Sequence, residues 1–228
     1  MNFWNKFKGE NKGDHQQSRE RMVEQQLRGR GIKNEAVLES MLTVPRHEFV
    51  PERLRKQAYA DKPLPIGEGQ TISQPYIVAL MVAALDPQPT DKVLEVGTGF
   101  GYAAAVLAQI VAEVYTVERF ESLAQEAERR YANLNYQNVE VKVGDGSQGW
   151  LENAPYQGIV VSAAAPSLPE SLVEQLDTGG RLVIPVGERS VQSLLRVSKK
   201  NDGKLLRENL CRVRFVPLLG EEGWNDDS

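Results

Sequence analysis

Lys92–Tyr102 reads KVLEVGTGFGY, and this stretch decides the fold that we expect for a chain of 228 residues. Apolar residues at 93, 94 and 96 predict a short buried strand, and glycines follow at 97, 99 and 101. The alanine-rich segment 103–112 predicts the next helix. Because glycine lacks a Cβ, it tolerates positive φ and lets a ligand approach the backbone closely. This order of elements is typical of a nucleotide-binding edge in a parallel sheet.

The spacing of these glycines distinguishes two kinds of ligand site. Dinucleotide-binding turns read G-x-G-x-x-G, whereas this turn reads G-x-G-x-G, with Glu95 two residues before Gly97. The E-x-G-x-G form resembles the first motif of class I S-adenosylmethionine (AdoMet) methyltransferases. The resemblance implies AdoMet as cofactor and S-adenosyl-L-homocysteine as its product. The alternative is a glycine-bearing turn between strand and helix that holds no ligand.

Segments after this turn predict an α/β fold. Strand patterns at 113–118, 139–143, 157–162 and 181–186 alternate with helical patterns at 121–134 and 168–176. Such alternation predicts a doubly wound, mostly parallel, Rossmann-like sheet with helices on both faces. Two further strands, 190–199 and 204–216, flank a turn signal at Asn201–Gly203 and predict a C-terminal antiparallel hairpin, which brings the sheet to seven strands.

The chain before the sheet predicts an N-terminal helical cap. Residues 1–17 are polar and are expected to form a mobile tail, and helical patterns follow at 18–30 and 34–43. We therefore predict one methyltransferase-like domain, 18–228, with a cap and substrate loop at 18–74 and a nucleotide-binding sheet at 75–228.

A segment rich in proline and glycine, 61–74, joins the cap to the sheet. Its composition predicts irregular structure, and long irregular segments within domains are often functional. The helix that follows, 75–85, has proline in its first turn. Ser73 therefore stands either in a functional loop or at the N-cap of this helix.

Composition and charge argue against several classes of protein. The chain has 27 Lys and Arg against 31 Asp and Glu, a net charge of −4, whereas nucleic-acid-binding proteins usually carry a basic surface. One cysteine, Cys211, and two histidines leave no internal disulfide and no Cys- or His-rich metal site, so we expect no metal. The longest apolar run, 76–85, is too short to span a bilayer, and the N-terminus lacks a signal-peptide core. We expect a soluble cytoplasmic monomer without nucleic-acid or membrane partners.

Acids at the ends of two predicted strands are candidate cofactor ligands. Glu118 follows Gly97 by 21 positions, close to the offset of about 20 at which an acid accepts hydrogen bonds from ribose hydroxyls. Asp145 follows the third strand and is placed to accept from an adenine amino group. The alternatives are an ordinary acid at a strand end for Glu118 and a plain Asp–Gly turn for Asp145.

A second stretch resembles one family among the methyltransferases. Pro63–Gly67 (PLPIG) followed by Gly69–Tyr76 (GQTISQPY) is similar to the signature of protein-L-isoaspartate O-methyltransferases, and the resemblance covers about residues 20–220. It implies protein repair: a methyl group passes from AdoMet to the free α-carboxylate of L-isoaspartyl residues in damaged proteins, and the ester converts through succinimide toward normal aspartate. Further matching segments are Val44–Arg46, Phe49–Val50, Gly144–Gly146, Ala163–Pro166, Gly179–Gly187 and Arg214–Leu218.

The same resemblance implies residue roles, with isoaspartyl-containing proteins and peptides as partners. Ser73 matches the active-site serine of the family, and its hydroxyl would donate to the acceptor carboxylate. That carboxylate is already ionised at neutral pH, so the reaction needs orientation more than a strong base. The expected substrate-binding residues are Thr71, Ile72, Ala164 and Pro166, and the expected cofactor-binding residues are Gln70, Glu95, Val96, Gly97, Thr98, Gly99, Glu118, Arg119, Asp145 and Gly146.

Two other functions remain open at this point. A class I methyltransferase acting on a small molecule or RNA would share the glycine turn, but it leaves Gly69–Tyr76 unexplained. An AdoMet-binding sensor without turnover would bind the cofactor and transfer no methyl group. Ala163–Pro166 also has two interpretations, because small residues suit both a ligand and tight helix packing.

Overall fold

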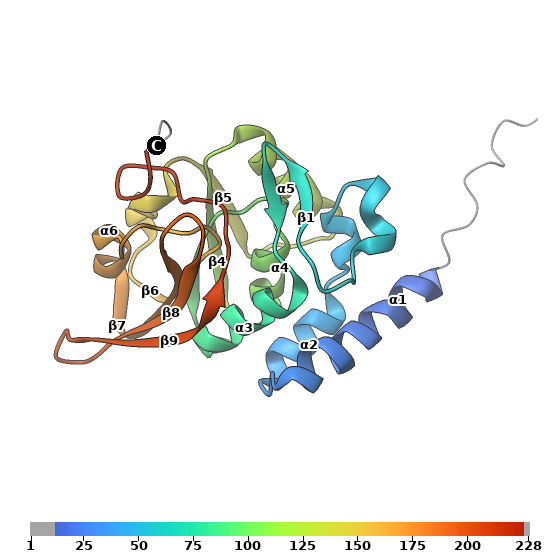
Figure 1. The fold of residues 1–228 in the computed structure, drawn as a ribbon, viewed down its shortest axis with the longest axis horizontal. Helices are drawn as coiled ribbons and strands as arrows, with labels where there is room; N and C mark the ends of the chain where they lie inside the picture. Colours follow the sequence, from blue (N-terminus) through green and yellow to red (C-terminus); the bar gives the residue numbers. More distant parts are fainter. Residues whose placement is uncertain (1–11, 226–228) are drawn as a thin grey trace, which may run out of the picture.

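A seven-stranded sheet forms the centre of the computed structural model, which describes residues 12–225 (Figure 1). Its strands are β3 (Lys92–Val96), β4 (Glu113–Glu118), β5 (Val139–Val143), β6 (Tyr156–Val161), β7 (Leu176–Gly187), β8 (Gln192–Lys199) and β9 (Leu205–Val213). They lie in the order β5-β4-β3-β6-β7-β8-β9. The first five along the chain pair in parallel, and β8 and β9 are antiparallel. The predicted fold class, including its C-terminal hairpin, is confirmed.

The order of the strands creates a switch point beside β3. The chain runs outward from β3 to β4 and β5, and then returns to place β6 on the other side of β3. Glu95 of β3 consequently lies between Thr116 of β4 and Val160 of β6. In open α/β sheets, ligands bind at the carboxyl ends of the strands at such a point.

Helices cover the sheet, as the alternation of elements predicts. They are α3 (Pro75–Leu85), α4 (Tyr102–Ala108), α5 (Glu121–Asn133) and α6 (Glu170–Glu174). α3 is apolar around most of its circumference because it is buried between the strands β6 and β7 and the N-terminal helices. No helix in the described part of the chain is long and apolar enough to cross a membrane. Short 3₁₀ turns occupy Arg46–Phe49, Glu52–Gln57, Gly146–Gln148 and Leu151–Asn153.

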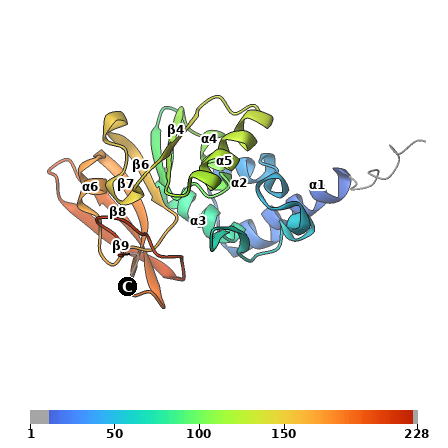
Figure 2. The ribbon, with the colours of Figure 1, turned by 90° about the horizontal axis from the view of Figure 1, so that it is seen from above.

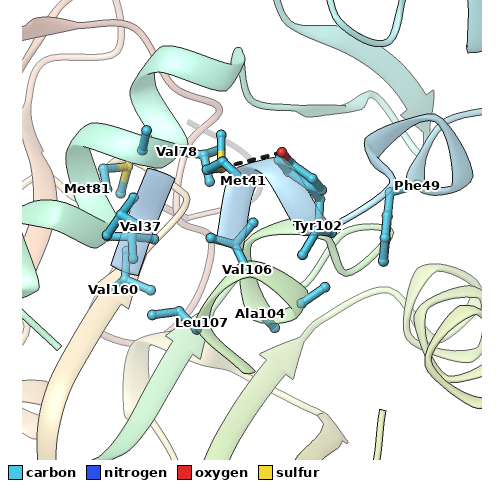
Figure 3. Packing of buried hydrophobic residues seen from close by; sticks show 14 of the residues in the cluster. Val37, Met41, Phe49, Val78, Met81, Tyr102, Ala104, Val106, Leu107 and Val160 are labelled. Carbon is cyan, nitrogen blue, oxygen red and sulfur yellow. Dashed lines mark hydrogen bonds between the residues drawn. The ribbon is translucent and has the colours of Figure 1, made fainter. Parts of the chain in front are cut away.

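The N-terminal cap packs on α3 and α4, at the opposite end of the molecule from β8 and β9 (Figure 2). It consists of α1 (Lys12–Arg21), a π-helical segment (Met22–Leu27), a 3₁₀ turn (Arg28–Arg30) and α2 (Glu35–Thr43). Asn34 begins α2, because its side chain accepts a hydrogen bond from the Val37 amide. Figure 3 shows the shared core, to which α2 contributes Val37 and Met41, α3 contributes Val78 and Met81, and α4 contributes Tyr102, Val106 and Leu107.

The first helix begins earlier than the sequence predicts. Residues 12–17, expected in a mobile tail, form the start of α1, whereas residues 1–11 lie outside the described part of the chain. Hydrogen bonds between side chains four residues apart, Gln16 to Glu20 and Arg21 to Gln17, support these polar turns. The ring of His15 also stacks on His47, with centroids 4.1 Å apart. Polar composition alone therefore placed the tail boundary too late.

The segment 61–74 is not irregular as expected. It contains an antiparallel hairpin, β1 (Leu64–Gly67) and β2 (Gln70–Ile72), in which Leu64 pairs with Ile72. Alternation explains the hairpin, because Leu64, Ile66 and Ile72 are buried while their neighbours are more exposed. Gly67 and Gly69 take φ angles of 109° and 68° and close the turn. The glycines that suggested disorder are the residues of the turn.

Candidate active site

A cavity lies where the carboxyl ends of β3, β4 and β6 meet the β1–β2 hairpin. It holds about 850 Å³ of empty space, its open mouth included. The predicted site residues that line it are Gln70, Thr71, Ile72, Ser73, Glu95, Val96, Gly97, Thr98, Gly99, Glu118, Arg119 and Gly146. The fold therefore brings together most of the residues that the sequence nominates, from four separate segments.

The glycine turn presents bare backbone to this cavity. Gly97 and Gly99 have φ angles of 93° and 54°, which side-chain-bearing residues rarely adopt. A Cβ on Gly99 would lie 3.0 Å from the Ile66 side chain, so the turn and the hairpin approach closely only because Gly99 has none. Behind the turn, the Tyr131 hydroxyl donates to the Gly101 carbonyl over 3.0 Å and occupies the space that a Cβ would need. The turn is thus shaped for close approach on both sides.

Glu95 is a buried acid with spare hydrogen-bonding capacity. Only 1% of the residue is exposed, and its Oε2 accepts from the Thr116 hydroxyl over 2.8 Å. The Thr116 and Thr98 hydroxyls share a further hydrogen bond of 2.6 Å. Within residues 12–225, Glu95 Oε1 has no hydrogen-bond partner, and burial raises the pKa of this carboxyl to about 8. A buried carboxyl oxygen without a partner suits a ligand that brings a donor, such as an ammonium group.

Glu118 closes the same site from the end of β4. Its Oε2 accepts from the Gly99 amide over 2.8 Å, and its Oε1 accepts from the Phe120 amide over 3.0 Å. The residue is 5% exposed. Each carboxylate oxygen can accept a second hydrogen bond, so the side chain keeps capacity for two ligand hydroxyls. This geometry fits the ribose role that the spacing predicts, and it also fixes the glycine turn.

Asp145 does not line the cavity. Its Oδ1 accepts from the amide and the hydroxyl of Ser147, and its Oδ2 accepts from the Glu221 amide over 2.8 Å. The residue caps a 3₁₀ turn and anchors the C-terminal segment, which corresponds to the structural alternative for an Asp–Gly turn. Gly146 does line the cavity, and a Cβ there would lie 2.5 Å from Val96 Cγ1. Adenine binding by Asp145 stays a prediction.

Ser73 follows β2 and precedes α3. The N-cap of α3 is Gln74, without a side-chain capping bond, so the alternative role for Ser73 as N-cap is wrong. Within the described chain the Ser73 hydroxyl makes no hydrogen bond, whereas its carbonyl accepts one of 2.7 Å from Arg46 Nη2. The Ser73 hydroxyl is therefore available to a ligand while the backbone beneath it is held.

Arg46 is the residue that holds this backbone. It is fully buried, its Nε donates to the Ala58 carbonyl over 2.7 Å, and its guanidinium lies 4.6 Å above the Tyr102 ring. Burial lowers the pKa of Arg46. Sequence analysis matched Arg46 to a family segment but gave it no role, because a buried arginine in a 3₁₀ turn has no local signature.

A second cavity, of about 1960 Å³ with its open mouth, adjoins the first and shares part of its lining. Thr71 and Ser73 line both cavities, so the two residues stand at the border between them. Ser162, Val216 and Pro217 line both as well. A small ligand in the first cavity can therefore meet a larger one in the second at Ser73.

Ala164 and Pro166 lie elsewhere than expected. Ala164 is buried, its amide donates to Val216 and its carbonyl accepts from Leu218, both over 2.8 Å. Pro166 is exposed and lines neither cavity. Ala164 is held by the backbone of 216–218, which differs from the tight helix packing that sequence analysis left open, and the preceding Ser162 and Ala163 line the first cavity instead.

Part of the site escaped sequence analysis. Ser162 could have been found, since it follows β6 at the switch point where ligands bind. The wall made by 216–219 overlaps Arg214–Leu218, a segment that sequence analysis matched to the family, and backbone hydrogen bonds to Ala164 hold it beside the cavity. Among residues 12–225, no group of three or more His, Cys, Asp and Glu side chains could hold a metal ion.

Comparison with known proteins places the chain in a family. The family model described as protein-L-isoaspartate(D-aspartate) O-methyltransferase matches residues 17–223. A protein-L-isoaspartate O-methyltransferase of Pelotomaculum thermopropionicum is 59% identical over 210 residues, which cover 92% of each chain. A solved structure named protein-L-isoaspartate O-methyltransferase has a TM-score of 0.79 at 29% identity and covers 90% of this chain and 66% of that chain.

A second solved structure comes from Plasmodium falciparum and is named as a protein-L-isoaspartate O-methyltransferase in complex with S-adenosyl-L-homocysteine. It has a TM-score of 0.75 at 28% identity, and the match covers 90% of this chain and 98% of that chain. The matches extend over the cap, the hairpin and the sheet, and they are not confined to the glycine turn. The chain therefore belongs to the protein-L-isoaspartate(D-aspartate) O-methyltransferase family, whose members are AdoMet-dependent enzymes of protein repair.

Proposed function

We propose that this chain methylates the free α-carboxylate of L-isoaspartyl residues in damaged proteins and that Ser73 orients the acceptor. One observation carries the proposal: Ser73 lines both the cavity beside the glycine turn and an open groove, and its hydroxyl has no hydrogen bond within the described chain. The following backbone amide nitrogen then attacks the ester carbonyl and expels methanol, which closes a succinimide, and hydrolysis of the ring returns part of the product as normal aspartate.

On the cofactor side, the residues present fit AdoMet. Bound AdoMet supplies an activated methyl group on a sulfonium. Glu95 Oε1, buried without a partner among the described residues, suits the methionine ammonium, and bare backbone at 97–99 suits the carboxylate. We assign Glu118, which lines the cavity, to the ribose hydroxyls, and Gly146 with the neighbouring Asp145 to the adenine edge. The remaining proposed contacts, which all line the cavity, are Gln70, Val96, Thr98 and Arg119.

On the acceptor side, orientation is the main contribution of the protein. The acceptor carboxylate is ionised at neutral pH, so it attacks without a general base. The Ser73 hydroxyl donates to one carboxylate oxygen and leaves the other to face the methyl group, while Thr71 and Ile72 line the boundary. Alignment of this kind can lower a barrier by about 7–11 kcal/mol.

The β1–β2 hairpin supports selectivity for the isomerised residue. Isoaspartate carries its α-carboxylate on a shorter arm than the side-chain carboxylate of aspartate, beside a rerouted backbone. Because Ile66 and Ile72 bury the hairpin against the core, its edge forms a fixed wall beside Ser73. Aspartate and isoaspartate carry the same charge, so a charged pocket alone cannot distinguish them. A fixed wall can, because the two carboxylates lie at different distances from the backbone.

The setting of the reaction is part of the proposal. A chain with one cysteine suits a reducing compartment, which supports a cytoplasmic enzyme. We further propose that it acts as a monomer on isoaspartyl-containing proteins and peptides. Cell fractionation and light scattering of the purified protein measure these two properties.

Methyl transfer from labelled AdoMet tests the activity. Two peptides that differ only in Asp or isoAsp at one position are compared under identical conditions. We expect base-labile label, released as methanol, on the isoaspartyl peptide alone. Equal labelling of both peptides would contradict the proposed selectivity. Base-stable label on RNA or a small molecule, with neither peptide labelled, would support the alternative methyltransferase class.

A further inference from the structure

Four arginines line the open groove beside Ser73. They are Arg30, Arg189, Arg212 and Arg214, and we call the cavity that they share with Ser73 the arginine groove. Among residues 12–225, no aspartate or glutamate lines it. The whole chain has a net charge of −4, so this groove is a local concentration of positive charge and does not follow from the overall composition.

Two of these arginines are engaged by their own surroundings. Arg30 pairs with Asp61 over 2.5 Å, and its guanidinium lies 3.5 Å from the centroid of the Tyr76 ring. Arg189 lies over the Trp224 ring at 5.0 Å and donates to the Asn225 carbonyl. These contacts hold the two side chains in place and reduce the charge that they offer to a ligand.

Arg212 and Arg214 differ from this pair. Both are exposed, and within the described chain neither makes a hydrogen bond or an ion pair. Arg212 is the penultimate residue of β9, the edge strand of the sheet, and Arg214 is the first residue after it. Both residues line the groove, so their charges lie at the same end of it.

The position of the groove determines what can meet these charges. It shares Thr71 and Ser73 with the cofactor cavity, so an isoaspartyl residue held at Ser73 leaves its neighbours in the chain lying along the groove. Exposed arginines favour carboxylates, which they can bind through two parallel hydrogen bonds. The residues that flank the damaged site therefore encounter a positive surface.

We infer that the arginine groove binds acidic residues flanking the isoaspartyl site, so that the enzyme favours damaged segments that carry a nearby Asp or Glu. Arg212 and Arg214 supply the attraction, and the engaged Arg30 and Arg189 frame the groove. This inference rests on the proposed function, because it places the methyl acceptor at Ser73.

Isoaspartyl peptides with variable flanks test the inference. Each set contains three peptides with the same isoaspartyl core and with Glu, Ala or Lys at the flanking positions. One set varies the residues before the isoaspartate, and a second set varies the residues after it. We expect the wild-type enzyme to show kcat/KM in the order Glu, Ala, Lys in at least one set. The Arg212→Gln/Arg214→Gln variant should reduce the ratio of kcat/KM for the Glu and Ala peptides about two- to tenfold, the size expected for two exposed ion pairs. At about 0.5 M salt the wild-type preference should fall as well.

Arg207→Gln is the matched control. Arg207 is exposed on β9, outside the groove, and its replacement removes one positive charge where the double variant removes two. We expect it to keep the wild-type ratio. The inference is overturned if the double variant keeps the wild-type ratio of kcat/KM for the Glu and Ala peptides, even if kcat/KM falls equally for both peptides. It is also overturned if Arg207→Gln lowers this ratio as much as the double variant does. Failure of the proposed function looks different, because then no isoaspartyl peptide is methylated, whatever its flanks.

Discussion

The cofactor wall and the acceptor wall of the active site are built in different ways. The cofactor wall comes from the ends of central strands, where the buried acids Glu95 and Glu118 accept hydrogen bonds from their own neighbours. The acceptor wall is a short hairpin and a loop, whose backbone is held by one buried arginine, Arg46, and whose hydroxyl at Ser73 is left available. We propose that the cofactor wall binds one small ligand, whereas the acceptor wall admits peptide segments of many sequences.

The largest effect is expected where the acceptor wall is held. Arg46→Met fills similar space but leaves the carbonyls of Ala58 and Ser73 without their donor. At about 1–3 kcal/mol for each unsatisfied group, the free energy of unfolding should fall by about 2–6 kcal/mol. Urea unfolding measures the loss, and kcat for an isoaspartyl peptide should fall while cofactor affinity changes less.

Arg53→Met provides the control for this variant. Arg53 is exposed in the neighbouring 3₁₀ turn, so its replacement should cost little. Arg46→Lys keeps the charge but lacks the planar fork that spans two carbonyls, and it should recover only part of the loss. If Arg46→Met unfolds at the wild-type urea concentration with wild-type kcat, the acceptor wall is held by something else.

The cofactor wall should respond mainly in binding. Glu118→Ala removes a carboxylate placed for two hydroxyls, and hydrogen bonds to charged groups contribute about 1.5–3 kcal/mol. We expect the Kd for S-adenosyl-L-homocysteine to rise about 10- to 100-fold, with a smaller change in the KM of an isoaspartyl peptide. Calorimetry measures the first quantity. Glu140→Ala, an exposed acid on β5, is the control, and a Kd that Glu118→Ala leaves unchanged would remove the ribose role.

The cofactor wall was predictable because its signals are local. A strand, three glycines and an acid within Lys92–Tyr102 specify one turn, and the spacing to Glu118 follows from the length of a strand–helix–strand unit. Parallel strands then bring their carboxyl ends to one edge wherever the helices between them lie. Chain order and the period of the apolar residues were therefore sufficient for this half of the site.

The acceptor wall was harder because its signals are tertiary. Proline and glycine in 61–74 predicted an irregular loop, and the buried alternation of Leu64, Ile66 and Ile72 was overlooked. Asp145 had the expected place in the chain, but the C-terminal segment supplies the Glu221 amide, and no local pattern reveals that contact. The backbone amide and carbonyl of Ala164 are likewise hydrogen-bonded to Val216 and Leu218, which lie far along the chain. Where a remote segment supplies the hydrogen-bond partner, sequence spacing does not show it.

Glu95 should make the stability of the cofactor-free enzyme depend on pH. Burial raises its pKa from a usual 4.5 to about 8, so between these values the folded protein holds a proton that the unfolded chain releases. The free energy of unfolding should therefore fall as the pH rises, by about 2 kcal/mol from pH 5.5 to pH 7 at 1.36 kcal/mol per unit. Glu95→Gln, which does not titrate, should lack this part of the slope in urea unfolding. Parallel pH profiles in the two proteins would contradict a neutral buried acid.

Ser73→Ala separates the two walls most finely, because it should change turnover and leave folding intact. The hydroxyl makes no hydrogen bond within the described chain and does not cap α3, so the free energy of unfolding should change by less than about 0.5 kcal/mol. Loss of a hydrogen bond to the acceptor carboxylate should lower kcat/KM about tenfold, or about 1.4 kcal/mol, with an unchanged Kd for S-adenosyl-L-homocysteine. Steady-state kinetics and calorimetry on one preparation measure both. A variant with wild-type turnover would leave the fixed hairpin edge as the only element that aims the carboxylate, and a variant with weakened cofactor binding would move Ser73 from the acceptor wall to the cofactor wall.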